Sequence, residues 1–196
     1  MKRLQRIGSY LAGLIILAAV VWQAAPVRGQ TSVVSSQFRV QLDILDRLLV
    51  GLSTVTAQFN PDYTQLLSHG TGNNQATTVW QDDRTLTASA SEDLDFNGSL
   101  TDAYGNSVTC TKLKALVVKA ASTNVNDVDV GGSNTTIAGR FGATNDIVSV
   151  RPGGLFLYLA ASTGVTVTNA SADLLTVANS AGSTSVTYDI ILLCVE

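Results

Sequence analysis

Residues 84–196 constrain the fold more than any other part of the chain. They form a succession of short segments rich in Val, Thr, Ser and Ala, separated by Gly, Asn and Pro turn signals about every 8 to 15 residues. Alternation of apolar and polar residues with this spacing, and without a helical interval, is typical of an antiparallel β-sandwich. We therefore predict an all-β domain over residues 84–196.

The strand-forming segments number eight or nine, which suits two four-stranded sheets. A jelly-roll-like sandwich is the expected fold, and an immunoglobulin-like sandwich is the alternative. The segments are Thr85–Phe96 (one strand or a pair), Ser107–Lys119, Asn126–Val130, Thr136–Arg140, Asp146–Val150, Leu155–Ala160, Val165–Thr168, Asp173–Val177 and Ser185–Val195.

The composition argues against nucleic-acid binding. Charged residues make up 14% of the chain, well below the roughly 25% of typical soluble proteins. Four basic residues lie before Gln30, and the rest of the chain carries 8 basic and 15 acidic residues, a net charge of about −7. A nucleic-acid groove needs a basic stripe, so no nucleic-acid partner is expected.

The N-terminus resembles an export signal. Lys2, Arg3 and Arg6 precede an apolar run over residues 7–22, and small residues lead to Gly29. This order predicts a signal peptide over residues 1–29 with cleavage near Gly29, or a membrane anchor if residues 7–22 are retained. A cleaved chain would be exported and extracellular.

Two further segments precede the β domain. Residues 30–58 are predicted to contain a short amphipathic helix, because apolar residues recur at coiled-coil spacing: Phe38, Leu42, Leu45, Leu49 and Leu52. This helix could dock on its own domain or bundle in an oligomer.

Residues 59–83 are predicted to be a linker, since they hold the turn signals Asn60-Pro61-Asp62 and Gly70–Asn74. His69, the only histidine, is expected to be solvated there.

Two segments are apolar at consecutive positions, Leu155–Ala160 and Ile190–Leu193. Strands buried on both faces have this pattern, whereas one face of a two-layer sandwich should be wet. A neighbouring subunit, the N-terminal helix or folded-over loops must therefore cover the second face. The pattern favours a homo-oligomer.

Motifs for chemistry are missing from the sequence. It contains no G-x-S-x-G and no phosphate loop, and its carboxylates cluster at Asp82-Asp83, Glu92–Asp95 and Asp127–Asp129. A solvated strand face explains these clusters better than a cation site. We expect no catalytic residue, no cofactor and no metal site. Cys110 and Cys194 either form a disulfide or are separate buried residues.

Seven segments together resemble small β-rich structural proteins of tailed phages and prophages. They are Gly70–Ala76, Asp83–Asp95, Gly98–Asn106, Lys114–Lys119, Val148–Gly154, Asp173–Asn179 and Thr187–Ile190. The resemblance spans residues 70–193, about two-thirds of the chain, and consists of turn and strand patterns. It implies a virion subunit such as a head-decoration, fibre or tail-associated protein. The export-type N-terminus departs from that group.

The leading hypothesis is a non-enzymatic structural protein that forms oligomers through its β-sandwich, with other virion proteins as further partners and the virion as its location. The alternative is an exported monomeric module that binds a glycan or a cell-surface partner. An enzyme of unrecognised type is motivated only by the carboxylate pairs.

Overall fold

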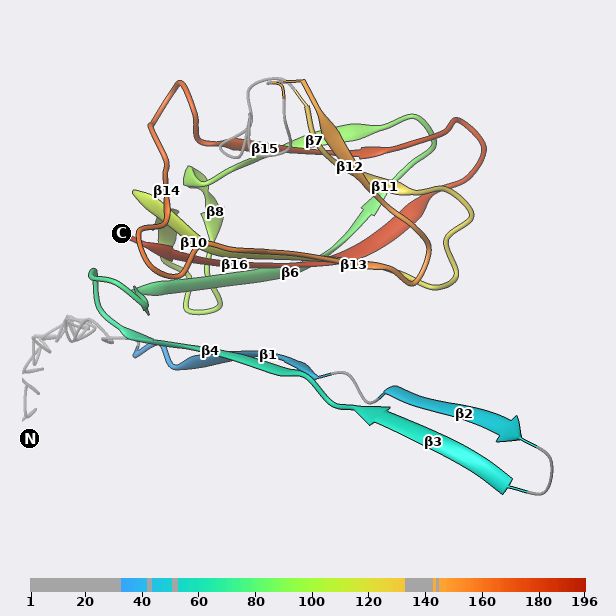
Figure 1. Ribbon diagram of the computed structural model, residues 1–196. Coiled ribbons are helices and arrows are strands. Elements are labelled where there is room, and N and C mark those ends of the chain that lie inside the picture. The colour runs from blue at the N-terminus through green and yellow to red at the C-terminus, as the bar shows by residue number, and fades with distance from the viewer. Residues whose placement is uncertain (1–32, 42–43, 51–52, 133–142, 144) are drawn as a thin grey trace, which may run out of the picture. The chain divides into compact units, whose positions relative to one another are not determined.

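The computed structural model describes residues 33–41, 44–50, 53–132, 143 and 145–196. Within this part the protein is all-β and contains no helix (Figure 1). None of the described residues belongs to a helix long and apolar enough to cross a membrane. The predicted signal or anchor over residues 1–29 and the strand predicted over Thr136–Arg140 lie outside the described residues.

A five-stranded sheet forms one layer of the domain. Its strand order is β13-β10-β16-β6, and β14 pairs with the first residues of β10. The strands are β6 (Thr78–Leu86), β10 (Lys112–Ala120), β13 (Leu155–Leu159), β14 (Val165–Thr166) and β16 (Val186–Val195). All pairings in this sheet are antiparallel.

A four-stranded antiparallel sheet faces it, in the order β12-β11-β15-β7. Its strands are β7 (Ser91–Asp95), β11 (Val128–Gly131), β12 (Ile147–Val150) and β15 (Leu174–Asn179). A small hairpin of β8 (Asn97–Thr101) and β9 (Ser107–Thr109) lies between β7 and β10 in the chain.

The hydrophobic core lies between the two sheets. β15 buries alternate residues, among them Leu175 and Val177, and β16 buries Tyr188, Ile190 and Leu192 in the same cluster. Period-two burial is what a strand with one face in a core requires. The sheets therefore form a β-sandwich, as the sequence predicted.

Strand pairing in the sandwich is nested along the chain. β11 pairs with β12, β10 with β13, β7 with β15, and β6 with β16. The β10–β16 pairing then joins the pairs β10–β13 and β6–β16 into one sheet, and the β11–β15 pairing joins β11–β12 and β7–β15 into the other. Strands close in sequence therefore mostly belong to opposite sheets.

A long two-stranded hairpin, here called the ribbon, precedes the sandwich. It consists of β1 (Ser36–Gln41), β2 (Ile44–Val50), β3 (Ser53–Phe59) and β4 (Asp62–His69). Gln41 pairs with Asp62 and Ile44 with Phe59, so both halves share one register. Pro61 lies at the interruption, where its missing N–H breaks the ladder. β4 also pairs in parallel with β5 (Gln75–Ala76).

The helix predicted within residues 30–58 is wrong for the described part of that range, which forms β1, β2 and β3. The spacing fits a helix, but two heptads do not decide between helix and strand when Val, Thr and Ile are frequent. Gly51 and Leu52 separate β2 from β3, and a Gly-led pair between two apolar runs is a hairpin signal that the heptad interpretation overlooked.

The predicted linker over residues 59–83 is also wrong, because it contains β4, β5 and most of β6. The sandwich begins at Thr78 rather than at residue 84. Thr85–Phe96 is a strand pair, the end of β6 followed by β7. The predicted strand Ser107–Lys119 is divided into β9 and β10, which belong to different sheets, and the later strands predicted within the described residues are confirmed with small shifts of their ends.

A β-bulge interrupts the alternation of β10. The register against β16 shifts between Leu113 and Ala115, so Lys114 is the extra residue. Leu113 and Leu116 both enter the sandwich core, whereas Ala115 belongs to a second cluster on the outer side of the sheet. Simple alternation groups Lys114 with Lys112 on a solvated face, but Lys114 is only 1% exposed.

Candidate functional site

The outer face of the four-stranded sheet is polar. Thr176 Oγ1 donates a 2.6 Å hydrogen bond to Asp93 Oδ1 on the neighbouring strand. Ser149 Oγ donates a 2.6 Å bond to Asp129 Oδ1 in the same way. Carboxylates that accept from hydroxyls on an exposed strand face act as solvated sheet residues. This face needs no cover.

The other carboxylate clusters also make structural contacts. Asp95 Oδ1 accepts from the Asn97 amide at 2.7 Å, Asp127 pairs with Arg151, and Asp82 pairs with Arg84. Within the described part of the chain, no group of three or more His, Cys, Asp or Glu residues is placed to hold a metal ion.

Glu92 connects the two sheets. It accepts a 2.6 Å hydrogen bond from the Tyr188 hydroxyl on β16 and forms a 2.8 Å ion pair with Arg84 on β6. Burial, and then the adjacent Glu92 carboxylate, raise the pKa of the Tyr188 phenol above its ordinary value. The three side chains therefore link β7 with β6 and β16.

His69 lies at the end of β4 rather than in a loop. It is exposed, as predicted, and its Nδ1 accepts a long hydrogen bond of 3.4 Å from the Val34 amide. This bond attaches the chain before β1 to the end of the ribbon.

The outer face of the five-stranded sheet is apolar around Leu193 and is covered there from within the chain, whereas Gln81, Asp83 and Asp189 are exposed further along it. Leu193 is 2% exposed and forms a cluster with Ala115, against which Ile191 packs. The ribbon supplies Leu67 and Phe38 to this cluster. Its other members are Val34, Ala76 and Ala161. The β1–β4 half of the ribbon therefore packs on this sheet face (Figure 1). The predicted cover does come from the N-terminal region, but as a β-ribbon.

Lys114 fixes the base of the ribbon to the sandwich. Its Nζ donates hydrogen bonds to the carbonyl oxygens of Gly72 at 3.1 Å, Ala161 at 3.3 Å and Ser162 at 2.7 Å. Those carbonyls belong to the β4–β5 loop and to the loop after β13. Burial, with a smaller contribution from nearby Lys112, lowers the pKa of Lys114. The bulge thus converts a surface lysine into an internal clamp.

Beyond this cluster, a groove of about 430 Å³ remains between the ribbon and β13. The ribbon wall is formed by Phe38, Val40 and Tyr63 together with the polar residues Asp62, Thr64 and Gln65, and the other wall is formed by Leu157 and Leu159. Val40 is 44% exposed, Tyr63 66% and Leu159 36%. The inner face of the ribbon is therefore covered at Leu67 but open at Val40 and Tyr63, which are cross-strand partners.

A single ion pair borders the groove. Arg39 Nη2 and Nε donate to the two oxygens of Asp62 at 2.6 and 3.1 Å. The hydrogen bond from Arg39 is the largest cause that lowers the pKa of the exposed Asp62 carboxyl. Both charges are matched, so the rim of the groove is close to neutral.

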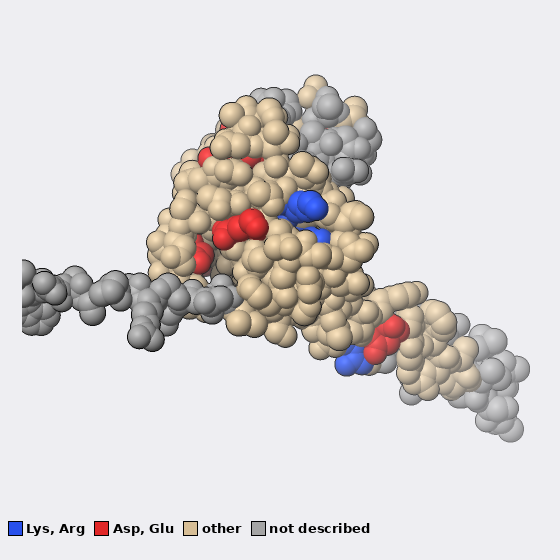
Figure 2. Space-filling view, turned by 90° about the vertical axis from the view of Figure 1, so that its left-hand side faces the viewer, with Lys and Arg blue, Asp and Glu red and all other residues tan. Residues whose placement is uncertain are grey.

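Charge is scarce on the surface more generally. Figure 2 shows a face on which acidic and basic residues are few and scattered among uncharged ones. A surface of this kind depends on hydroxyl, amide and apolar groups for any contact it makes.

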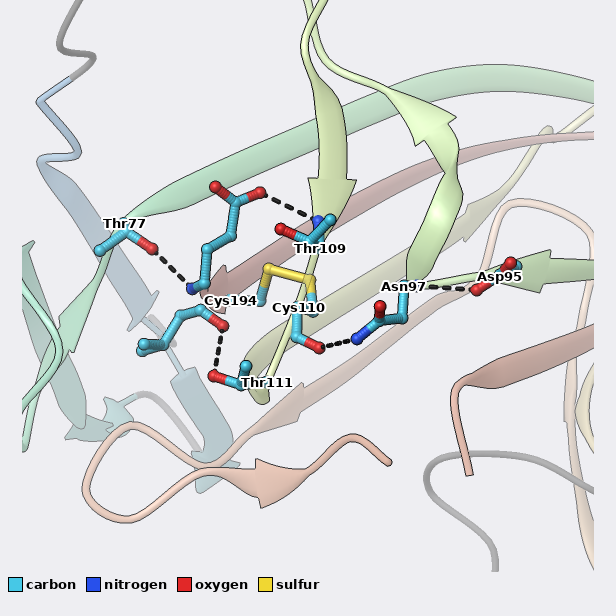
Figure 3. Close-up of a disulfide and its surroundings, with 9 residues drawn as sticks. Thr77, Asp95, Asn97, Thr109, Cys110, Thr111 and Cys194 are labelled. Atoms are coloured by element: carbon cyan, nitrogen blue, oxygen red, sulfur yellow. Dashed lines mark hydrogen bonds between the residues drawn. A yellow bond between two sulfur atoms is a disulfide. The ribbon is translucent and has the colours of Figure 1, made fainter. Parts of the chain in front are cut away.

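A disulfide joins Cys110 and Cys194, a pairing that the sequence left open. Both cysteines are fully buried, with Cα atoms 5.6 Å apart and a sequence separation of 84. Hydrogen bonds surround the bond: Asn97 Nδ2 donates to the Cys110 carbonyl at 3.0 Å, and Thr111 Oγ1 donates to the Val195 carbonyl at 3.0 Å (Figure 3).

Comparison with known proteins gives no relative: no protein-family model matches the chain, and a search of curated proteins finds no match.

Sequence reasoning missed the groove and the Lys114 clamp. The groove is made by residues more than 90 positions apart in the chain, such as Val40 and Leu159, and no local pattern reports such a meeting. One feature of the sequence does point to the buried position of Lys114. Lys114 interrupts an otherwise apolar run from Leu113 to Val118, and a bulge is one way for a strand to accept such a residue.

Proposed function

We propose that this protein is a non-enzymatic structural subunit that forms homo-oligomers through its β-sandwich and the ribbon attached to it. The observation that carries this proposal is the apolar groove, whose two walls expose Val40, Tyr63 and Leu159 beside a neutral rim. Exposed apolar surface with a polar border is typical of protein–protein contact sites.

A jelly roll is the fold class we propose for the sandwich. A jelly roll is in effect a long antiparallel hairpin wrapped around a barrel-like core, with its first and last strands side by side. The nested pairings β11–β12, β10–β13, β7–β15 and β6–β16 support this class, as do the two pairings that close the roll.

The virion of a tailed phage is the context we propose, with a role as a head-decoration, fibre or tail-associated subunit. The support is the resemblance of residues 70–193 to structural proteins of such phages. In the three carboxylate clusters, Asp82, Asp93, Asp127 and Asp129 make sheet or ion-pair contacts, which fits a structural role.

The test is the solution mass of the full chain, measured by light scattering on a sizing column over a range of concentrations. A defined closed oligomer at micromolar concentration is the expected result. Monomers that persist at the highest soluble concentration would overturn the assembly proposal.

An exported monomeric binding module is the second candidate. The observation that favours it is the Cys110–Cys194 disulfide, since such bonds persist mainly in oxidising compartments. The intact mass of protein secreted from a bacterial host separates the candidates. Loss of residues 1–29 together with a monomeric mass supports the module, and an uncleaved oligomer contradicts it.

A further inference from the structure

We infer that the groove between the ribbon and β13 is the docking site for a second copy of this chain, and that the second copy inserts the outer half of its own ribbon, β2 and β3. This inference rests on the proposed assembly function and specifies the surfaces by which the copies meet.

The groove continues an interface that already exists within the chain. Leu67 and Phe38 of the ribbon pack on Leu193 and Ile191 of the sheet. Further along the same ribbon face, Val40 and Tyr63 stand across from Leu157 and Leu159 with space between them. The Val40, Leu157 and Leu159 side chains have the apolar chemistry of the closed part, and Asp62, Thr64 and Gln65 add polar groups to the ribbon wall. An apolar strand or ribbon is the occupant that extends this packing.

Among the described strands, none pairs with the outer half of the ribbon as a third strand. Its two strands, β2 and β3, pair with each other. An isolated two-stranded hairpin is at best marginally stable in water. Phe59, at the start of this half, is 63% exposed. One copy therefore offers an exposed groove, and its neighbour offers a two-stranded hairpin that pairs with no third strand among the described residues.

Charge also favours contact at this place. Two copies of a chain with a net charge of about −7 beyond Gln30 repel each other unless they meet at neutral surfaces. Among the described residues at the rim of the groove, the charged ones are the matched pair Arg39–Asp62. Residues 44–59 contain one acidic and one basic residue, Asp46 and Arg47. Neither surface brings an unmatched charge into the contact.

The first experiment places a charge in the groove of the full chain. Val40→Lys and Tyr63→Lys alter exposed residues of the groove wall, and Gln37→Lys is the control on the opposite face of β1. We expect both groove variants to raise the dissociation constant of the oligomer by at least about tenfold. Gln37→Lys should leave the constant unchanged. Circular dichroism and melting curves check that each variant is folded.

The outcomes separate the inference from the proposed function. An oligomer that Val40→Lys and Tyr63→Lys leave intact overturns the groove as the interface, while assembly itself stands. A wild-type chain that stays monomeric overturns the proposed function as well. Dissociation by Gln37→Lys to the same degree as by Val40→Lys also contradicts the inference, because the effect would then be one of net charge.

The second experiment identifies the occupant. Phe59→Cys and Leu159→Cys are prepared separately, mixed and mildly oxidised, with Phe59→Cys mixed with Leu66→Cys as the control on the outward ribbon face. We expect covalent dimers that contain one copy of each variant only in the first mixture. Dimers formed by Leu159→Cys alone would indicate groove-to-groove contact and overturn the ribbon as occupant. A disulfide closed within single chains of a Leu14→Cys/Leu159→Cys variant would place the apolar N-terminal run in the groove and also overturn it.

Discussion

The two sheets of the sandwich share one core but differ on their outer faces. The central strand β15 turns Thr176 outward, where its hydroxyl bonds Asp93. The central strand β16 turns Ile191 and Leu193 outward, where they pack against the ribbon. The outer face at β15 is in contact with solvent, whereas the outer face around Leu193 on β16 packs against another layer of protein. The need for cover is therefore encoded in individual strands rather than in the sandwich as a whole.

The comparison also explains why the ribbon is attached so firmly at its base. Lys114 and the cluster around Leu67 hold it where the outer face is most apolar. Further from the base, cover is incomplete, and the groove opens. The chain itself therefore buries only part of the apolar surface on the outer face of the five-stranded sheet. The polar outer face of the four-stranded sheet has no comparable apolar surface to bury.

The sharpest way to break the comparison is to truncate one outward residue on each central strand. Leu193→Ala should lower the free energy of unfolding by about 2–5 kcal/mol, because it removes a buried side chain. Thr176→Ala should cost about 1 kcal/mol or less, since it removes one exposed hydrogen bond. Urea denaturation measures both. Equal losses for the two variants would mean that the faces do not differ in burial.

The Lys114 clamp gives the next largest effect. Lys114→Met removes the Nζ donor from three carbonyl groups, of which that of Ala161 also accepts from the Asn74 amide, and should cost about 1–3 kcal/mol at neutral pH. Lys112→Met, at the exposed neighbour on the same strand, is the control and should change little.

The pH dependence sharpens this prediction. The pKa of Lys114 is lowered in the folded state, so just below the ordinary value of 10.5 the unfolded chain binds more protons. The contribution of Lys114 to stability should therefore rise as the pH increases through that window. The difference in unfolding free energy between the wild type and Lys114→Met, followed by urea denaturation from pH 8 to pH 10, should increase. A constant difference would argue against a buried cation.

A smaller effect is expected where the ribbon only partly covers the sheet. Phe38→Ala removes a partly buried ring and should cost about 1–2 kcal/mol, less than truncation of a fully buried aromatic residue. It should also speed protease cleavage within the ribbon. Leu66→Ala, on the outward face of β4 and 61% exposed, should have no measurable effect on either quantity. Matching effects of the two changes would show that the ribbon does not rest on the sheet through Phe38.

The smallest effect belongs to the polar face. Ser149→Ala removes the hydrogen bond to Asp129 and should change the free energy of unfolding by less than about 1 kcal/mol. A thermal melt is enough to detect a larger loss. Such a loss would indicate that the four-stranded face carries more of the stability than solvated contacts explain.

The sandwich strands could be predicted from the sequence because their signal is local. Turn residues such as Pro152-Gly153-Gly154 end segments in which alternate residues enter one core. The turn residues and the alternation can both be recognised within about ten residues of sequence. The doubly apolar run Ile190–Leu193 likewise predicted a covered outer face, and Leu192 and Leu193 are both buried. The other doubly apolar run, Leu155–Ala160, is covered less than predicted, because Leu155 is 64% exposed and Leu159 36%.

The ribbon and the clamp could not be predicted in the same way. The spacing of Phe38, Leu42, Leu45 and Leu49 fits a helix better than the period of two that a strand requires. The strands form because of pairing with residues 53–67 and because of packing on the sheet, neither of which is local. A bulge at Lys114 moves every later residue of β10 to the opposite face, and the partner strand β16 decides where it falls.

The disulfide gives the chain an unequal response to a pulling force. Tension applied between the ribbon and Glu196 passes from Cys194 directly to Cys110, and then back through β9, β8, β7 and β6. The loop that the bond closes carries none of that load. Even after the sandwich opens, β10 to β15 and most of β16 cannot be drawn out by their ends. A subunit built in this way would lengthen under load by its ribbon and first strands, while the larger part of its sheet-forming chain stays together.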